Sequence, residues 1–433
     1  MNTPGMVSSG SSLAAHVTLA LSTVLHAFTH AYGIMLVPLY LLMVDDLGLR
    51  GVRAASLIVT IYGLVYCLGS FPAGILADRL NRKALLGIGL IGNALAILLM
   101  GLTRRYEWLV VLSVMAGLFG TLFHPAANAM VPAHYPRAPG MAIGLLGIGS
   151  GIGFFAGPQF AGWRAQAAQW QWGDIGDWQR PLVEAGLFGI VLGVLFLVLA
   201  REANRYDATR TIHRHRPLSG QMRRRVLSIA AVLCCRDFAG VATFTLLSIY
   251  LQKALGYTPK RTGLLIGAMM LMGVVANPVA VWLSGGRRRL RALAGILVSG
   301  GLVLATVPWA ATAWLLPVLM CFQALHLGSY AVGEAALLER VGPNDRGRVV
   351  GLFIGLAGTI ASSAAWAMGR WTDSLGAAAQ LRDSYYLPFA AMGGLMMLAS
   401  LAMPLIARLG PASEQEPQAP AWEIDPGTMG PGG

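Results

Sequence analysis

The sequence predicts an all-α polytopic membrane protein with twelve transmembrane helices. Its 433 residues are 56% hydrophobic and only 12% charged, and their mean hydropathy is +0.62. A soluble protein carries about 25% charged residues, so this composition suits a lipid bilayer. The 54 glycines agree with that reading, because helices that pack closely in lipid rely on small residues at their contacts.

Twelve apolar stretches are long enough to cross the hydrocarbon core, which takes about 20 residues of helix. We expect the spans at 17–43, 53–76, 84–102, 107–131, 139–162, 181–200, 226–251, 262–284, 290–309, 312–337, 347–369 and 385–407. A basic linker separates the first six spans from the last six. The expected domains are 1–200, the linker 201–225, 226–408, and a disordered cytoplasmic tail, 409–433, rich in Pro, Gly and Glu.

The charges predict how the chain is oriented. Most of the 32 Lys and Arg residues lie in the linker, the tail and the loops that face inward if the N-terminus is inside. Cytoplasmic loops carry such an excess, so we expect both termini in the cytoplasm of an inner-membrane protein. The eight arginines of the linker form a solvated surface near the lipid headgroups. The chain has no basic face with interleaved aromatic residues, so a nucleic-acid partner is not expected.

The two sets of six spans repeat each other in sequence. When the chain is aligned with itself, Pro72 meets Pro278, and Arg82-Lys83 meets Arg288-Arg289. Two similar halves predict two pseudo-symmetric six-helix bundles with a substrate site between them, near the middle of the membrane. Transport by alternating access then follows from one half rocking against the other.

A short cationic loop between the second and third spans carries the most specific motif. It reads G-I-L-A-D-R-L-N-R-K, and its motif residues are Gly74, Asp78, Arg79, Arg82 and Lys83. The string resembles the loop signature G-x-L-a-D-R-x-G-R-[RK] of the major facilitator superfamily of secondary transporters. Asn81 stands where the family usually has Gly, a mild departure because Asn also tolerates a left-handed turn.

This resemblance implies the major facilitator fold and a gating role for Asp78. In the family, the acidic residue pairs with cations at the inner surface and with the inner end of the eleventh helix. Such a contact would hold the outward-open state and break as the two halves rock.

The fifth span resembles the family's antiporter signature, G-x3-G-P-x-x-G-G, with Ala161 in place of one Gly. Its matching residues are Gly153, Gly157, Pro158 and Gly162. Glycines four apart also form a flat stripe for helix packing, which is the alternative explanation. Pro158 is expected to bend the helix. A second antiporter signature places an Arg in the fourth span, but Ser113 stands at that position, which speaks against drug–proton exchange by the common route.

Histidines in the first and fourth spans narrow the resemblance. The string Phe123-His124-Pro125, with His26 and His30 in the first span, resembles the fosmidomycin-resistance branch of the superfamily. That resemblance implies a proton-driven exporter of small drugs.

The pair His26 and His30 is itself a candidate for chemistry, since residues four apart share one face of a helix. A histidine with its ordinary pKa of about 6.5 suits proton exchange, and two at this spacing also suit a transition metal. No third ligand is near them in sequence, so no metal site is predicted. His124 and His326 are candidates to complete a cluster in the cavity, and a hydrogen-bonded helix residue is the alternative for each.

Ionisable groups within the spans are functional candidates, because a charge in the bilayer is costly unless it is paired. Arg236 and Asp237 lie near mid-depth of the seventh span. Adjacent residues do not face each other on a helix, so each is expected to pair across the cavity, Arg236 with Glu334 of the tenth span. A purely structural ion pair is the alternative. Tyr62 and Asn128 are further polar candidates for the cavity wall.

The predicted function is that of a proton-coupled secondary transporter that exports a small molecule or drug. Asp237 or Glu334 would bind the proton, and Arg236 would set its affinity. We expect a monomer among membrane lipids, without a cofactor. Import or export of a metal ion, small organic solute or lipid-like substrate is the alternative, and a transporter-like sensor or assembly scaffold is the alternative of another class. An enzyme is not expected, since the chain has no Gly-x-Ser-x-Gly, no His-Glu-x-x-His and no clustered carboxylates.

Overall fold

The computed structural model describes residues 9–167, 175–202, 218–342 and 345–409. In these ranges, 12 helices are long and apolar enough to cross a membrane, and they confirm the twelve predicted spans with ends that differ by a few residues. Most of the basic linker and nearly all of the predicted tail lie outside the described residues.

The first six spans form the N-terminal bundle. Its helices are α1 (Ser9–Ile34), η1 (Val37–Leu39) and α2 (Tyr40–Asp46), which together make the first span, then α3 (Val52–Arg79), α4 (Arg82–Leu102), α5 (Tyr106–Gly120), α6 (Phe123–Ala133), α7 (Pro139–Gln166) and α8 (Arg180–Leu199).

The last six spans form the C-terminal bundle. Its helices are α9 (Gly220–Ile249), α10 (Pro259–Met270), α11 (Met272–Leu283), α12 (Arg289–Thr306), α13 (Leu315–Leu338), α14 (Arg346–Ser362), α15 (Ala364–Ser374), α16 (Tyr386–Leu398) and α17 (Ala402–Ala407). Short turns join or extend these helices: η2 (Tyr250–Ala254), η3 (Gly286–Arg288), η4 (Val307–Trp309), η5 (Gly376–Gln380), η6 (Arg382–Tyr385) and η7 (Ala399–Leu401).

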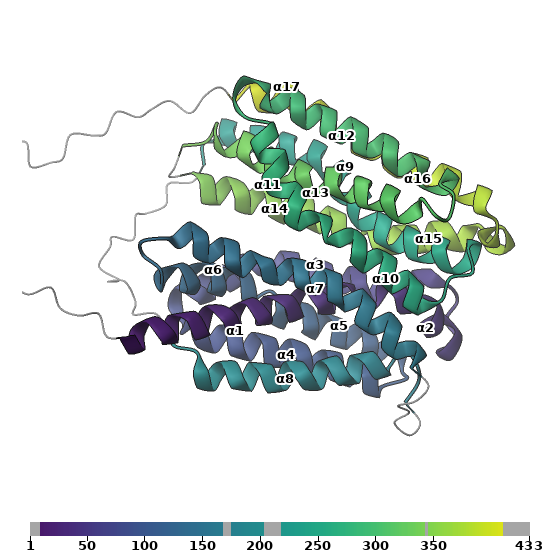
Figure 1. Ribbon diagram of the computed structural model, residues 1–433, viewed down its shortest axis with the longest axis horizontal. Coiled ribbons are helices and arrows are strands. Elements are labelled where there is room, and N and C mark those ends of the chain that lie inside the picture. The colour runs from purple at the N-terminus through teal and green to yellow at the C-terminus, as the bar shows by residue number, and fades with distance from the viewer. Residues whose placement is uncertain (1–8, 168–174, 203–217, 343–344, 410–433) are drawn as a thin grey trace, which may run out of the picture.

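The two bundles lie side by side, and helices from each line the contact between them (Figure 1). α7 packs against α10, and α3 packs against α14 and α15. The start of α1, the end of α8, the start of α9 and α17 lie at one end of the molecule, which we call the linker end. We call the opposite end the distal end.

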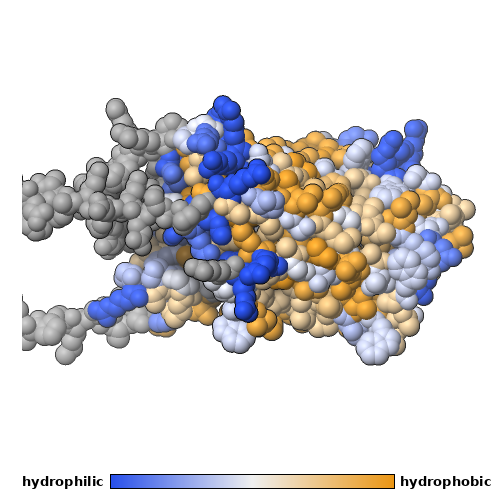
Figure 2. All heavy atoms as spheres, turned by 90° about the horizontal axis from the view of Figure 1, so that it is seen from above, coloured by the Kyte–Doolittle hydropathy of each residue, from blue (hydrophilic) through white to orange (hydrophobic). Residues whose placement is uncertain are grey.

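The surface carries the apolar band that a bilayer requires. Hydrophobic residues cover the middle of the molecule, and hydrophilic residues gather at its two ends (Figure 2). On α8, for example, Phe188, Val191 and Val198 are exposed. Apolar patches of this extent mark surfaces that lipid or a partner covers. With twelve spans, the molecule is a multi-pass membrane protein.

A stripe of glycines brings two helices of the N-terminal bundle into backbone contact. A Cβ added to Gly149 would lie 2.2 Å from the carbonyl oxygen of Thr23, and one added to Gly153 would lie 2.1 Å from that of Ala27. The backbones of α7 and α1 therefore come this close at positions where glycines of α7 face α1. This is the packing role that the sequence left open as the alternative to an antiporter motif.

The same motif continues into the contact between the bundles. A Cβ on Gly162 would lie 2.2 Å from the carbonyl oxygen of Pro259, at the start of α10. The contact is reciprocal, because Gly263 of α10 faces the carbonyl oxygen of Pro158 on α7. Pro158 does not interrupt α7, which runs on to Gln166. One half of the motif thus packs within a bundle and the other half packs across to the second bundle.

Candidate functional site

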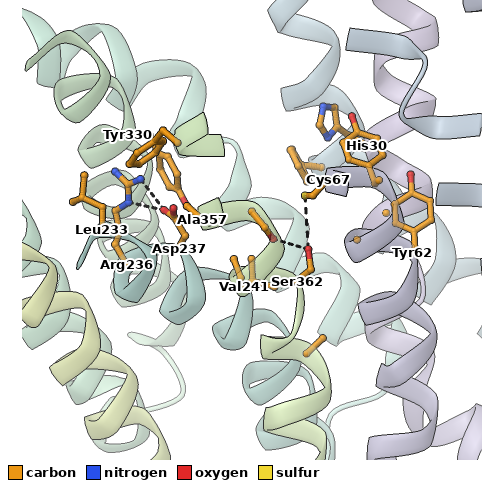
Figure 3. Close-up of a pocket in the computed structure, with 18 of the residues that line it drawn as sticks. His30, Tyr62, Cys67, Leu233, Arg236, Asp237, Val241, Tyr330, Ala357 and Ser362 are labelled. Atoms are coloured by element: carbon orange, nitrogen blue, oxygen red, sulfur yellow. Dashed lines mark hydrogen bonds and ion pairs between the residues drawn. The ribbon is translucent and has the colours of Figure 1, made fainter. Parts of the chain in front are cut away.

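A cavity of about 430 Å³ lies between the two bundles. Its polar lining consists mainly of His30, Tyr62, Tyr66 and Cys67 from the N-terminal bundle and Arg236, Asp237, Tyr330 and Glu334 from the C-terminal bundle. Figure 3 shows His30, Tyr62 and Cys67 on one wall and Arg236, Asp237 and Tyr330 on the other. The lining continues along α13 and α14 to Leu337 and Val350, towards the linker end. The structure therefore brings five of the predicted residues, His30, Tyr62, Arg236, Asp237 and Glu334, to one site.

The charges on α9 pair differently from the prediction. Arg236 donates from Nε to Asp237 Oδ1 at 2.7 Å, so the two neighbours pair with each other (Figure 3). The Arg236 guanidinium also lies 3.7 Å above the ring of Tyr330 and donates to the carbonyl oxygen of Ser329 at 3.3 Å. Neighbouring side chains leave a helix in different directions, but a long Arg side chain can fold back along its own helix. The expected pair with Glu334 is therefore wrong for this state.

Glu334 remains as an open carboxylate of the cavity. Its side chain is exposed and lines the cavity on α13, one turn before that helix ends at Leu338. It makes no hydrogen bond or ion pair with another described residue. Arg236 and Asp237, by contrast, are only 1% and 5% exposed. The C-terminal wall thus offers a buried, satisfied ion pair beside a carboxylate that is free to take a proton or a cationic ligand.

The N-terminal wall carries a cluster of three histidines. The rings of His26, His30 and His124 have centroids 4.8 to 5.4 Å apart. His30 Nε2 lies 3.0 Å from His26 Nε2, and His26 Nδ1 lies 2.8 Å from the carbonyl oxygen of Leu146 on α7. A carbonyl oxygen only accepts, so His26 Nδ1 carries the proton that it donates. The structure places the His124 ring beside the two histidines of α1.

Local sequence explains how His124 reaches the other two. The fourth span breaks after α5, and Pro125 falls in the first turn of α6, where a missing N–H is tolerated. Phe123 stacks on His26 with ring centroids 4.7 Å apart, and Phe154 packs on His30 at 4.5 Å. These aromatic rings hold the imidazoles in place by packing against them.

Two predicted residues lie elsewhere. Asn128 is exposed on α6, one turn beyond His124, and does not line the cavity. His326 belongs to the C-terminal bundle, where its ring stacks on Phe322 and meets Tyr330 edge-on. A Cβ on Gly240 would lie 2.1 Å from His326 Nε2, so α9 presses on this ring. His326 is a packed residue and does not join the cluster.

At the distal end, a carboxylate from one bundle caps a helix of the other. Asp373 on α15 accepts hydrogen bonds from the backbone N–H groups of Val52 at 2.8 Å and Arg53 at 3.0 Å, in the first turn of α3. The residue before that turn, Gly51, has a φ of +136°, and a Cβ there would lie 2.4 Å from Asp373 Oδ2. An anion at a helix N-terminus satisfies free N–H groups and complements the helix dipole.

The pseudo-symmetric position holds a second cap. Gln166, the last residue of α7, accepts from the backbone N–H of Lys260 in the first turn of α10 at 3.2 Å. Ser248 of α9 donates to the carbonyl oxygen of Val37 at 2.7 Å, which is another contact between the bundles. The distal end is therefore closed by polar contacts as well as by glycine packing.

A further cross-bundle bond lies closer to the cavity. The backbone N–H of Trp366, in the first turn of α15, donates to Thr60 Oγ1 of α3 at 3.0 Å. The break between α14 and α15 frees this N–H, because the preceding turn no longer supplies its acceptor.

The motif at 74–83 lies at the linker end, and it is not the loop that the sequence predicted: Gly74 to Arg79 belong to the last turns of α3, and α4 begins at Arg82. Its contacts also differ from the prediction. Asp78 is exposed and makes no hydrogen bond or ion pair with another described residue, so the expected pairing is not formed in this state. Asn81 has a φ of −66° and caps α4 by accepting from the backbone N–H of Ala84 at 2.7 Å. Its role is that of an N-cap, not of a left-handed turn. Glu202 caps the same helix, accepting from the backbone N–H of Lys83 at 2.7 Å.

Sequence comparison then decides the family. A model of the Major Facilitator Superfamily matches residues 19–363 and 229–429. The chain belongs to the major facilitator superfamily. The family consists of membrane transporters and not of enzymes, and with this membership the motif at 74–83 and the internal repeat have one explanation.

Individual relatives add detail. The multidrug resistance protein MdtG of Dickeya zeae (strain Ech586) is 34% identical over 143 residues, which are 32% of this chain and 35% of that protein. MdtG of Enterobacter lignolyticus (strain SCF1) is 35% identical over 133 residues, 30% of this chain and 32% of that one. The aligned stretch spans about a third of the length of these relatives.

Solved structures agree in fold. A bacterial homologue of the human lysosomal transporter Spinster, in an inward-facing and unoccupied conformation, has a TM-score of 0.77 at 14% identity and covers 92% of this chain and 98% of its own. A point mutant of the nucleoside transporter NupG has a TM-score of 0.73 at 12% identity, over 90% of this chain and 99% of its own. At these identities the likeness concerns the fold alone.

Proposed function

We propose that the protein is a proton-coupled exporter of small molecules that works by alternating access between the two bundles. The observation that supports it most is the cavity itself, which lies between the bundles and holds an open carboxylate, Glu334, next to the buried pair Arg236 and Asp237. Intramembrane charges are kept where they bind ions or substrates. The relatives named as multidrug resistance proteins favour efflux of a drug-like substrate.

The proposed cycle begins from a state that is closed at the distal end. Asp373, Gln166 and Gly162 of α7 join the bundles there. With both termini in the cytoplasm of the inner membrane, this state opens inward and takes up its substrate. In the opposite state Asp78, exposed here, would pair across the linker end and hold the cavity open to the outside.

Coupling requires that substrate and proton compete for one group. A carboxylate in the cavity binds a cationic substrate when ionised and releases it when protonated, so an inward proton gradient drives export. Asp237 and Glu334 are the two carboxylates on the wall. Arg236 pairs with Asp237, whereas the Glu334 carboxylate is open to the cavity.

Drug susceptibility in a host without its own efflux pumps tests the proposal. The panel would include cationic drugs, as the competition for a carboxylate requires, together with phosphonate antibiotics. It would compare the wild type with Asp237→Asn and Glu334→Gln, each of which removes a charge with little change of shape. We expect resistance from the wild type and its loss in at least one variant. Asp45→Asn is the matched control, because Asp45 is an exposed residue of α2 whose carboxylate makes no hydrogen bond or ion pair with another described residue.

Membrane insertion must be verified for every variant, and proton movement must be recorded with the purified protein in sealed vesicles. Substrate-dependent alkalinisation or acidification that persists unchanged in both variants would refute the assignment of the proton to this wall. A wild type that is inserted but confers no resistance to any compound and moves no proton would refute coupled export itself.

A further inference from the structure

Three histidines of the N-terminal bundle converge on one point beside the cavity. One nitrogen from each of His26, His30 and His124 lies within 4.8 Å of the other two. His26 Nε2 and His30 Nε2 are 3.0 Å apart. Two nitrogen ligands of one tetrahedral zinc ion, with bonds of about 2.0 Å, are about 3.3 Å apart. The closest pair is therefore already at ligand spacing, and the third nitrogen lies within 4.8 Å of both.

We propose that His26, His30 and His124 form a binding site for a divalent first-row transition-metal ion. The site combines two residues one turn apart on α1 with one residue from the first turn of α6. His30 lines the cavity, so the fourth coordination position faces the space between the bundles. Three protein ligands with one open position are typical of sites that exchange their fourth ligand.

The surroundings of His26 orient it as a ligand. Its Nδ1 donates to the carbonyl oxygen of Leu146, so in the neutral ring Nε2 has a lone pair directed at His30. A metal-binding histidine typically donates its other ring N–H to a carbonyl or carboxylate in this way, which fixes the ring and raises its basicity. Gly149 makes that bond possible, because any Cβ at this position would push α7 away from α1.

The donor set selects the class of ion. The cluster, as the described residues form it, contains three imidazoles and neither a thiolate nor a carboxylate. Imidazole suits zinc, copper, nickel, iron and cobalt, whereas magnesium and calcium prefer oxygen ligands. The carboxylates of Asp237 and Glu334 lie on the opposite wall, so the remaining ligand comes from the cavity, as water or as a group of the transported solute.

The competing explanation is a hydrogen-bonded network that only stabilises the wall. In that case His30 donates to His26 and no ion is needed. The two explanations differ in what added metal does to the protein. Neither depends on the direction or the coupling of transport, so the site can be tested apart from the proposed function.

The test is metal binding by the purified full-length chain in lipid nanodiscs. Zinc would be titrated in competition with a chromophoric chelator, and cobalt would be added to record the visible absorption of a four-coordinate ion. We expect one saturable site per chain, with no competition from magnesium or calcium. His30→Gln and His124→Gln should each weaken zinc binding by at least about tenfold and abolish the cobalt band.

The control is His134→Gln. His134 is a histidine outside the membrane spans, bonded to the carbonyl oxygen of Arg201, and its loss should leave zinc binding unchanged. Zinc should also raise the thermal stability of the wild type but not that of His30→Gln, which separates a lost site from a misfolded variant. No saturable site in the wild type, or equal binding in all three variants, would overturn the proposal. Binding without any transport would leave the site in place and refute only the proposed function.

Discussion

The two bundles place different chemistry at equivalent positions of one cavity. The spacing that aligns Pro72 with Pro278 also aligns His30 with Arg236 and His124 with Tyr330. In the N-terminal bundle the two side chains are imidazoles with ring centroids 5.4 Å apart. In the C-terminal bundle they are a guanidinium and a phenol ring, 3.7 Å apart. The equivalent helices, α1 with α6 and α9 with α13, are thus in contact in both bundles, but different side chains form the contact.

The difference has an energetic consequence. A guanidinium that is 1% exposed needs compensation for its lost hydration, and it finds this in Asp237, Ser329 and Tyr330. An imidazole can be neutral, so the histidine cluster needs no counter-ion and relies on close helix packing instead. The C-terminal wall should therefore be sensitive to loss of charge, and the N-terminal wall should be sensitive to added volume.

The largest effect is expected at the ion pair. Arg236→Ala and Asp237→Ala each leave one buried charge without its partner, which costs about 3–5 kcal/mol of folding stability. The double variant removes both charges and should be less destabilised than the sum of the two single variants. Thermal unfolding of the four proteins in detergent completes the cycle. His30→Ala should lower the folding stability less than either single variant, because it leaves no buried charge without a partner.

Additive losses in that cycle would mean that the two side chains do not depend on each other. The C-terminal wall would then resemble the histidine wall in its energetics, and the contrast between the bundles would fail.

An added methyl group should have the next largest effect, on the N-terminal side. In Gly149→Ala the new Cβ would meet the carbonyl oxygen of Thr23 at 2.2 Å and His26 Cβ at 2.8 Å. Overpacking of this kind costs about 1–3 kcal/mol. Gly147→Ala, on the same helix, is the matched control, because nothing lies within 4 Å of its Cβ position. The midpoint of thermal unfolding should fall in the first variant and stay equal or rise in the second.

Equal midpoints would show that α7 can move away from α1 without loss. Close packing of α7 on α1 would then not be what stabilises the N-terminal wall, and the contrast with the C-terminal wall would fail.

The fold was predictable from sequence because its signals are long or repeated. About 20 consecutive apolar residues identify a span without reference to any other part of the chain. The repeat then divides the spans into two sets of six. His26 and His30 were also predictable as a pair, because helical spacing alone places them on one face.

The partners of the site residues were harder to predict, since they depend on side-chain conformation and on the state of the transporter. Helical geometry argues against contact between neighbouring residues, yet the Arg236 side chain is long enough to reach Asp237 along the helix. The cap that Asp373 gives to α3 joins residues more than 300 positions apart. The only local signal was the unsatisfied start of α3 after Gly51, which indicates that an acceptor is needed but not where it comes from.

The smallest energetic effect should be on the equilibrium between the two states of the transporter. Substitutions at the two ends of the molecule should shift this equilibrium in opposite directions. Asp373→Ala removes a cap that joins the bundles in this state, a loss of about 1 kcal/mol, or about a fivefold shift towards the opposite state. The Asp78 carboxylate has no partner among the described residues in this state, so Asp78→Ala should not destabilise it. It should destabilise only the opposite, outward-open state, and the population should shift towards the state described here.

Cys67 offers a reporter for both variants, because it lines the cavity on α3. With the other three cysteines replaced by Ser, a membrane-impermeant maleimide added at the distal face should label Cys67 faster in Asp373→Ala and more slowly in Asp78→Ala than in the parent protein. Stability losses alone would change both rates in the same direction. A common direction would therefore show that one of the two carboxylates does not act as a gate, whereas opposite directions require two gates at opposite ends of one cavity.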